Sequence, residues 1–127
     1  MTLAKIIEEL KKIQADQPDL TVSFGFCGAF PILKGGSSRC FYERFAIDWA
    51  VRRKGEESKH NPSTVTKLLA FLQSAIGTRI EGYKGGIYTV NEYLPLHVDG
   101  YGECTSTFVS GVVNRGYEVV LVTEHGQ

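Results

Sequence analysis

The chain has 127 residues, of which 43% are hydrophobic and 22% are charged, with 14 basic and 14 acidic side chains. This length and composition predict one globular domain, residues 1–127, that can bury a core without metal ions or disulfides. The absence of net charge argues against a protein that coats DNA or RNA polymers or lies on a membrane, since those functions normally require a basic excess.

The cysteines and the first residues predict a cytoplasmic protein. Cys27, Cys40 and Cys104 are odd in number and show no CxxC spacing, which is typical of reduced thiols and not of disulfides or a zinc site. Residues 1–9 are charged and amphipathic and lack the apolar run of a signal peptide. No later stretch is long enough to span a bilayer.

The chain begins with a predicted helix and a predicted strand. Apolar residues recur at helical spacing from Thr2, a candidate N-cap, to about residue 14. The turn at residues 17–19, which contains a proline, ends this helix. Residues 20–26 then alternate between apolar and small or polar side chains, as a half-buried strand does.

A Gly/Ser-rich segment and a longer strand follow. Pro31 and residues 34–38 predict a loop, which does not match the phosphate-binding P-loop pattern. Residues 40–51 alternate as a half-buried strand. Arg39, between the two, is either a solvated side chain or a fork for phosphate oxygens. The charged residues 52–60 predict a surface loop.

The second half of the chain predicts one helix and a further group of strands. Residues 61–76 have helical periodicity, and Gly77 is placed to end the helix. The later strands are expected at residues 87–90, 95–98, 105–113 and 117–123, the last two as a hairpin. The order of elements predicts an α+β fold: a mainly antiparallel sheet with two helices packed on one side.

Residues that usually form catalytic or metal sites are scattered along the sequence. His60, His97 and His125 match no catalytic or metal-binding spacing, and the carboxylates are dispersed. Cys104 and His97 remain a candidate thiol and base, with buried filler as the alternative for the cysteine. The sequence therefore favours a binding protein without metal or cofactor over an enzyme.

Residues 79–107 combine five glycines and four tyrosines with Lys84 and His97. Glycine allows the backbone to approach a ligand closely, a tyrosine ring stacks on flat groups, and lysine binds phosphate. This composition suits a nucleotide. It also suits, and more commonly indicates, ordinary hairpin turns beside a sheet.

Two segments carry the motifs of a known family. Residues 38–47 match a Tyr-Arg-Gly-Tyr-Tyr strand followed by a Leu-Ala-Leu-like end. Residues 82–86 read Gly-Tyr-Lys-Gly-Gly, with residues 75–78 before them. Residues 95–98 and 102–104 match a Thr-Pro-hydrophobic-Trp-Val strand and the turn after it. Together the segments resemble the first class of Thoeris anti-defence proteins, which are small phage-encoded proteins.

Three positions depart from the family pattern. Ser38 is not aromatic, Cys40 stands where the family usually has glycine, and His97 takes the place of a tryptophan. These departures affect the motif segments themselves, so the resemblance leaves open which ligand is bound.

The resemblance implies a sponge and not a catalyst. Such a protein binds a cyclic ADP-ribose isomer, the signal of a bacterial immune response, and sequesters it without cleavage in the host cytoplasm. Some members also hold cyclic oligonucleotides. The resemblance further implies a homo-oligomer with ligand sites between subunits. Two alternatives stay open: a hydrolase that opens the same ligand using His97 or a carboxylate, and a protein–protein inhibitor or accessory phage protein without a small ligand.

Under this interpretation the ligand requires stacking rings, cations, amides, hydroxyls and closely approaching glycine backbone. The candidate ligand-binding residues are Arg39, Tyr42, Tyr83, Lys84, Gly85, Gly86, Asn91, Thr105, Thr107, Asn114 and Arg115.

Overall fold

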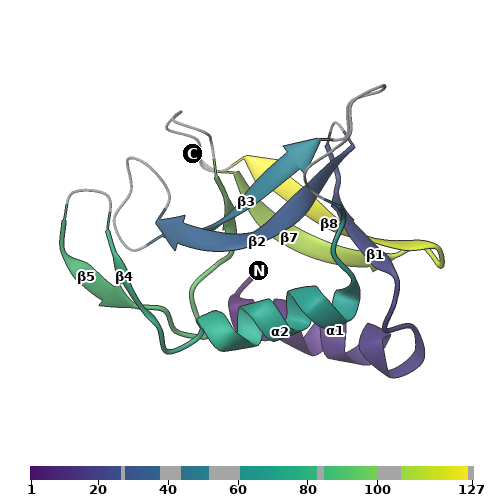
Figure 1. Ribbon diagram of the computed structural model, residues 1–127, viewed down its shortest axis with the longest axis horizontal. Coiled ribbons are helices and arrows are strands. Elements are labelled where there is room, and N and C mark those ends of the chain that lie inside the picture. The colour runs from purple at the N-terminus through teal and green to yellow at the C-terminus, as the bar shows by residue number, and fades with distance from the viewer. Residues whose placement is uncertain (27, 38–43, 52–60, 83–84, 100–106, 126–127) are drawn as a thin grey trace.

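A six-stranded mixed sheet lies over two helices, and a separate two-stranded hairpin extends from one end of the molecule (Figure 1). The computed structural model describes residues 1–26, 28–37, 44–51, 61–82, 85–99 and 107–125. The strands are β1 (Thr21–Phe24), β2 (Ala29–Ser37), β3 (Phe45–Val51), β4 (Arg79–Glu81), β5 (Ile87–Thr89), β6 (His97–Val98), β7 (Thr107–Asn114) and β8 (Glu118–His125).

Both helices begin at a threonine N-cap. Helix α1 (Leu3–Asp16) follows Thr2, whose hydroxyl accepts a hydrogen bond from the Lys5 N–H. Helix α2 (Val65–Ala75) follows Thr64, whose hydroxyl accepts from the Lys67 N–H. Each cap satisfies a backbone donor that the first helical turn leaves without a partner.

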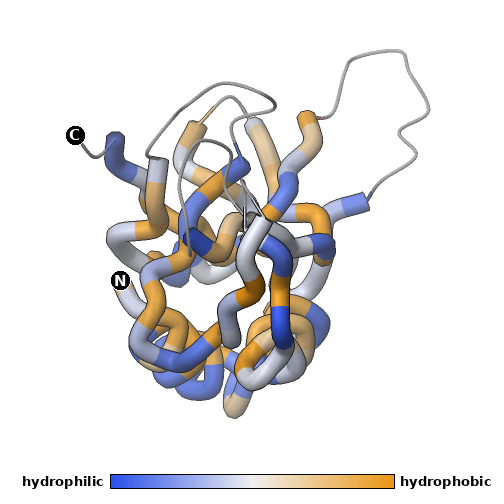
Figure 2. Tube along the Cα trace, turned by 90° about the vertical axis from the view of Figure 1, so that its left-hand side faces the viewer, coloured by the Kyte–Doolittle hydropathy of each residue, from blue (hydrophilic) through white to orange (hydrophobic). Residues whose placement is uncertain are grey.

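The apolar faces of the helices build the core. Leu3, Ile6 and Leu10 of α1 are fully buried, as are Leu68 and Leu72 of α2. The helices contact each other and lie on one side of the sheet, as Figure 2 shows in a view turned by 90°. The predicted α+β fold, with a mainly antiparallel sheet and two helices on one side, is therefore confirmed.

The strand order in the large sheet is β1-β8-β7-β6-β3-β2. Two of its five pairings are parallel, β1 with β8 and β3 with β6, and the other three are antiparallel. The outer strands β1 and β2 are consecutive in the chain and contact each other. The sheet therefore curves until its two outer strands approach.

The predicted strand faces agree with the burial of β3. Phe45 and Ile47 belong to the core cluster, and Trp49 and Val51 pack against it. The predicted hairpin near the C-terminus is also present, as β7 and β8. Gly77 follows α2 with φ +90°, a conformation that side chains with a Cβ rarely adopt.

One predicted loop is wrong. The segment with Pro31 and residues 34–38 was expected to be a loop, but residues 29–37 form the outer strand β2. A proline is compatible with an outer strand because one edge of that strand needs no N–H donor. The pairing with β3 also shifts register between Ile32 and Gly35, and this irregularity accommodates the glycines. The second helix starts at Val65, later than the expected residue 61.

Candidate functional site

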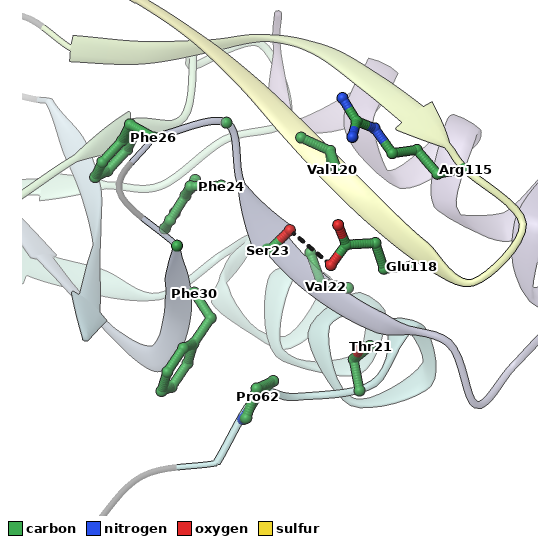
Figure 3. Close-up of a pocket in the computed structure, with 12 residues that line it drawn as sticks. Thr21, Val22, Ser23, Phe24, Phe26, Phe30, Pro62, Arg115, Glu118 and Val120 are labelled. Atoms are coloured by element: carbon green, nitrogen blue, oxygen red, sulfur yellow. Dashed lines mark hydrogen bonds between the residues drawn. The ribbon is translucent and has the colours of Figure 1, made fainter. Parts of the chain in front are cut away.

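A cleft of about 480 Å³ lies beside β1 and β8 (Figure 3). Its walls come from β1 and the turn after it, residues 21–26, from Gly28, and from Phe30 of the opposite edge strand β2. Pro62 closes one end, and the β7–β8 hairpin contributes Arg115, Glu118 and Val120. The cleft therefore forms where the two outer strands of the sheet approach each other.

The strand period decides which β1 side chains face the cleft. Val22 and Phe24 point into the core and are at most 3% exposed. Thr21 and Ser23 lie on the opposite face, because successive side chains of a strand alternate. In the parallel pairing with β8, Thr21 lies beside Glu118 and Ser23 beside Val120. The outward face of β1 and the outward face of β8 thus form one floor.

Among the described residues that line this cleft, Glu118 is the one acidic residue, and a serine binds its side chain. The Ser23 hydroxyl donates to Glu118 Oε2 over 3.2 Å. Glu118 and Arg115 line the same cleft, yet among the residues the structure describes neither takes part in an ion pair. The cleft therefore offers a cation and a carboxylate that do not neutralise each other through a direct contact.

The end of helix α1 fixes the turn that carries Arg115. The Arg115 N–H donates to the Glu118 carbonyl over 2.9 Å, and the Gly116 N–H donates to Asn114 Oδ1 over 2.8 Å. Gln17, just after α1, accepts a hydrogen bond from Asn114 Nδ2 (2.9 Å) and donates one to the Gly116 carbonyl (3.3 Å). These bonds hold the turn, and with it the backbone of Arg115, against the helix layer.

Aromatic rings close the other side of the cleft. The Phe26 ring stacks on Phe24 with centroids 5.4 Å apart and meets Trp49 edge-on at 5.5 Å. The Trp49 Nε1–H donates to the Asp99 carbonyl over 2.8 Å. Phe30 is only 2% exposed, and Figure 3 shows it near Pro62. A ring supported by neighbouring rings is a fixed platform for a flat ligand group.

Gly82, Gly85 and Gly86 of the second motif segment lie between β4 and β5 and are joined by backbone hydrogen bonds typical of a tight turn. The Gly82 N–H donates to the Gly86 carbonyl (2.7 Å), and the Gly85 N–H donates to the Gly82 carbonyl (3.1 Å). Gly85 and Gly86 have φ values of +92° and +76°. This hairpin and the Arg115 turn lie at opposite ends of the molecule (Figure 1). One subunit therefore does not bring these two predicted elements together.

Described residues next to the two motif segments nevertheless lie in neighbouring elements. Strand β2 ends at Ser37, immediately before the first motif segment, and contacts β4. Strand β4 leads into the turn at residues 82–86. The described residues next to the two motifs thus belong to elements that pack together.

Three candidate polar residues are engaged in local hydrogen bonds. Asn91 Oδ1 accepts from the Tyr93 N–H over 2.9 Å. Thr107 Oγ1 lies 2.8 Å from His125 Nδ1. Asn114 stabilises its own turn, as described above. Arg39, Tyr42, Tyr83, Lys84 and Thr105 lie outside the described residues, as do Cys40, Cys104 and His60.

His97, on the short strand β6, is 6% exposed, and its Nδ1 has no hydrogen-bond partner among the described residues. Burial lowers the pKa of its imidazole, and the nearby positive charge of Arg44 lowers the pKa further, while a hydrogen bond with the Pro95 backbone opposes the shift. The ring meets Phe108 edge-on with centroids 6.3 Å apart. Burial among the described residues thus favours the neutral form of the His97 imidazole.

Sequence reasoning missed Ser23, Phe30 and Glu118. The alternation of residues 20–26 already placed Ser23 on the outward face of a strand, and this signal was available. The positions of Phe30 and Glu118 depended on which strands pair, which alternation alone does not reveal.

Within the residues that the structure describes, no group of three or more His, Cys, Asp or Glu side chains is arranged to hold a metal ion. None of the described helices combines the length and the apolar character that crossing a membrane requires. Comparison with protein-family models, with curated proteins and with solved structures found no match to this chain.

Proposed function

We propose that this chain is a phage anti-defence protein that binds a cyclic ADP-ribose isomer in the cytoplasm of the infected cell and sequesters it without cleavage. The resemblance of residues 38–47 and 82–86 to the Thoeris anti-defence family motivates the choice of ligand. The cleft beside β1 and β8 is the observation that carries the proposal, because it brings a cation, hydroxyls and an aromatic ring to one hollow.

The cleft matches the ligand in size and in chemistry. Its volume of about 480 Å³ falls within the range of small-molecule sites, roughly 300–1,000 Å³. Arg115 supplies a guanidinium for a diphosphate, and the partly exposed ring of Phe26 supplies a face for adenine. Sequestration must compete with a cellular sensor. It therefore needs at least submicromolar affinity, about 8 kcal/mol of binding free energy.

We further propose that the complete site forms between subunits. The Gly82–Gly86 turn and the Arg115 turn lie at opposite ends of one subunit. A head-to-tail contact between subunits, repeated around a ring, would bring the glycine turn of one subunit to the Arg115 turn of the next. Both ends also expose hydrophobic side chains. Ile87 is 63% exposed beside the glycine turn, and Tyr117 is 69% exposed in the Arg115 turn. A contact between copies would cover both.

Light scattering tests this assembly. We expect the mass of a multimer for the wild-type protein and a shift towards the monomer for Ile87→Lys. Gln73→Lys, which adds the same charge on the exposed surface of α2, should leave the mass unchanged. A monomeric wild-type protein at all concentrations would contradict the proposed assembly.

Ligand capture tests the function itself. The purified protein is incubated with cyclic ADP-ribose isomers, the free ligand is removed by filtration, and the protein is boiled. We expect intact ligand in the supernatant only after boiling, in at most one equivalent per site. Free ligand that remains at stoichiometric protein would reject sequestration. Products beyond one equivalent would instead identify a hydrolase, and a folded protein that binds none of the isomers would favour a protein–protein inhibitor.

A charge-removing pair of variants assigns the capture to the cleft. Arg115→Gln should weaken capture about tenfold or more, because hydrogen bonds from a charged donor to phosphate contribute roughly 1.5–3 kcal/mol. Lys67→Gln removes one positive charge from the exposed face of α2, outside the cleft lining, and should leave ligand capture unchanged. Equal losses in both variants would show that only net charge matters.

A further inference from the structure

Glu118 is a charged residue of the cleft that the proposed phosphate and adenine contacts leave unused. A partly buried carboxylate without a cationic partner is costly unless something else satisfies its oxygens. The Ser23 hydroxyl donates to Oε2 only, and among the described residues no other hydrogen bond or ion pair engages Oε1. The carboxylate therefore has acceptor capacity that faces a cavity.

The geometry of the hairpin couples this acceptor to Arg115. The hydrogen bond from the Arg115 N–H to the Glu118 carbonyl sets the distance between their backbones. Figure 3 shows both side chains extending over the cleft floor, with the guanidinium near Val120 and the carboxylate near Ser23. A ligand that contacts both must carry an anionic group and, a short distance away, a group rich in hydrogen-bond donors.

We propose that Glu118, oriented by Ser23, is a specificity-determining residue that recognises the neighbouring 2- and 3-hydroxyls of a ribose whose phosphate contacts Arg115. This inference rests on the proposed function for the identity of the whole ligand. Two adjacent hydroxyls donate to one carboxylate, which is a general way in which proteins recognise ribose. A cyclic ADP-ribose isomer keeps both hydroxyls on at least one ribose, because the bond that closes its ring uses at most one of them.

The inference predicts discrimination between ribose and 2-deoxyribose. Removing one hydroxyl leaves a carboxylate oxygen without its donor, and a hydrogen bond to a charged group is among the stronger ones. We therefore expect ribose 5-phosphate to bind the wild-type protein about tenfold more tightly than 2-deoxyribose 5-phosphate. The two probes differ only in this hydroxyl.

The test is a titration of the isotope-labelled full chain with each sugar phosphate, up to about 10 mM, followed by NMR at the amides of residues 21–25 and 115–120. Glu118→Gln keeps the shape of the side chain but makes it a weaker hydrogen-bond acceptor. It should therefore lower the affinity for ribose 5-phosphate and leave the affinity for 2-deoxyribose 5-phosphate unchanged. Ser23→Ala keeps the charge but frees the carboxylate, so it should reduce the preference in part. Arg115→Gln should lower the affinity for both sugar phosphates equally.

Three results would overturn the inference: equal affinity of the wild-type protein for the two sugars, equal weakening of both by Glu118→Gln, or no shifts at the cleft amides. Glu118 is partly exposed, and a dispersed spectrum of each variant verifies its fold. If the protein captures the cyclic signal but binds the two sugars equally, only the role of Glu118 is rejected and sequestration is retained. A ribose preference without capture of the cyclic signal would reject sequestration and retain the role of Glu118.

Discussion

Gly35 in the outer strand β2 provides a direct test of how the sheet packs on its core. A Cβ atom at this position would lie 2.6 Å from Phe45 Cζ and 2.7 Å from Phe45 Cε2, and 3.3 Å from Phe71 Cζ. Phe45 is 1% exposed, so its ring cannot swing into solvent. The glycine thus leaves the space in which a core ring lies, an arrangement known to stabilise glycines in outer strands.

The expected cost of Gly35→Ala follows from two opposing effects. Adding a methyl group to a filled core typically costs about 1–3 kcal/mol. Replacing glycine also lowers the conformational entropy of the unfolded chain, which stabilises the folded state by about 0.4–1 kcal/mol. The net loss in the free energy of unfolding is therefore about 1–2 kcal/mol, which lowers Tm by several degrees in a domain of this size, roughly 3–8 °C.

Gly36 is the matched control in the same strand. A Cβ atom there meets no other atom within 4 Å, and its φ is not positive. Gly36→Ala should therefore leave the free energy of unfolding unchanged or raise it slightly. Urea and thermal unfolding, followed by circular dichroism, measure both variants. If Gly35→Ala were as stable as Gly36→Ala, the packing of Phe45 against β2 described here would be refuted.

Three further variants test the turns and the buried histidine. The pKa of His97 is lowered in the folded state, so the unfolded chain binds more protons than the folded chain below about pH 6.5. The free energy of unfolding should therefore decrease as the pH decreases in this range. His97→Leu should flatten this dependence between about pH 7 and 5, while His125→Gln should keep it, as pH-dependent urea unfolding would show. Gln17→Ala should accelerate amide exchange at Gly116 and cost about 1 kcal/mol or less, since it removes two exposed hydrogen bonds. Gly86→Ala should cost about 1–2 kcal/mol in thermal unfolding, because its φ of +76° strains any side chain; an unchanged Tm would contradict that conformation.

Periodicity in the sequence was sufficient for the helices and for the faces of the strands. The apolar stripe of residues 3–10 and the alternation from Phe45 to Val51 both reflect burial on one side, which is a local property. Strand partners are not local. The parallel pairing of β1 with β8 joins residues nearly one hundred positions apart, and no alternation pattern encodes it.

The same distinction applies to the candidate site. Arg115 was predicted as a cation for a diphosphate, and the structure places it beside a cleft. Asn91 and Asn114 were predicted as ligand contacts, but both accept backbone hydrogen bonds within their own turns, a common use of asparagine. Ser23 and Glu118 became neighbours only through the β1–β8 pairing, so their contact was outside the reach of sequence reasoning.

The pairing of β1 with β8 also constrains when the protein can fold during synthesis. Residues 21–24 have no sheet partner until residues 118–121 have left the ribosome, because those are the residues with which they pair. Such distant pairings close late, since the intervening chain must lose its freedom first. Strand β1 therefore lacks its sheet neighbour on the nascent chain, although α1 can already pack against α2, and the cleft is complete only after translation has reached the last strand.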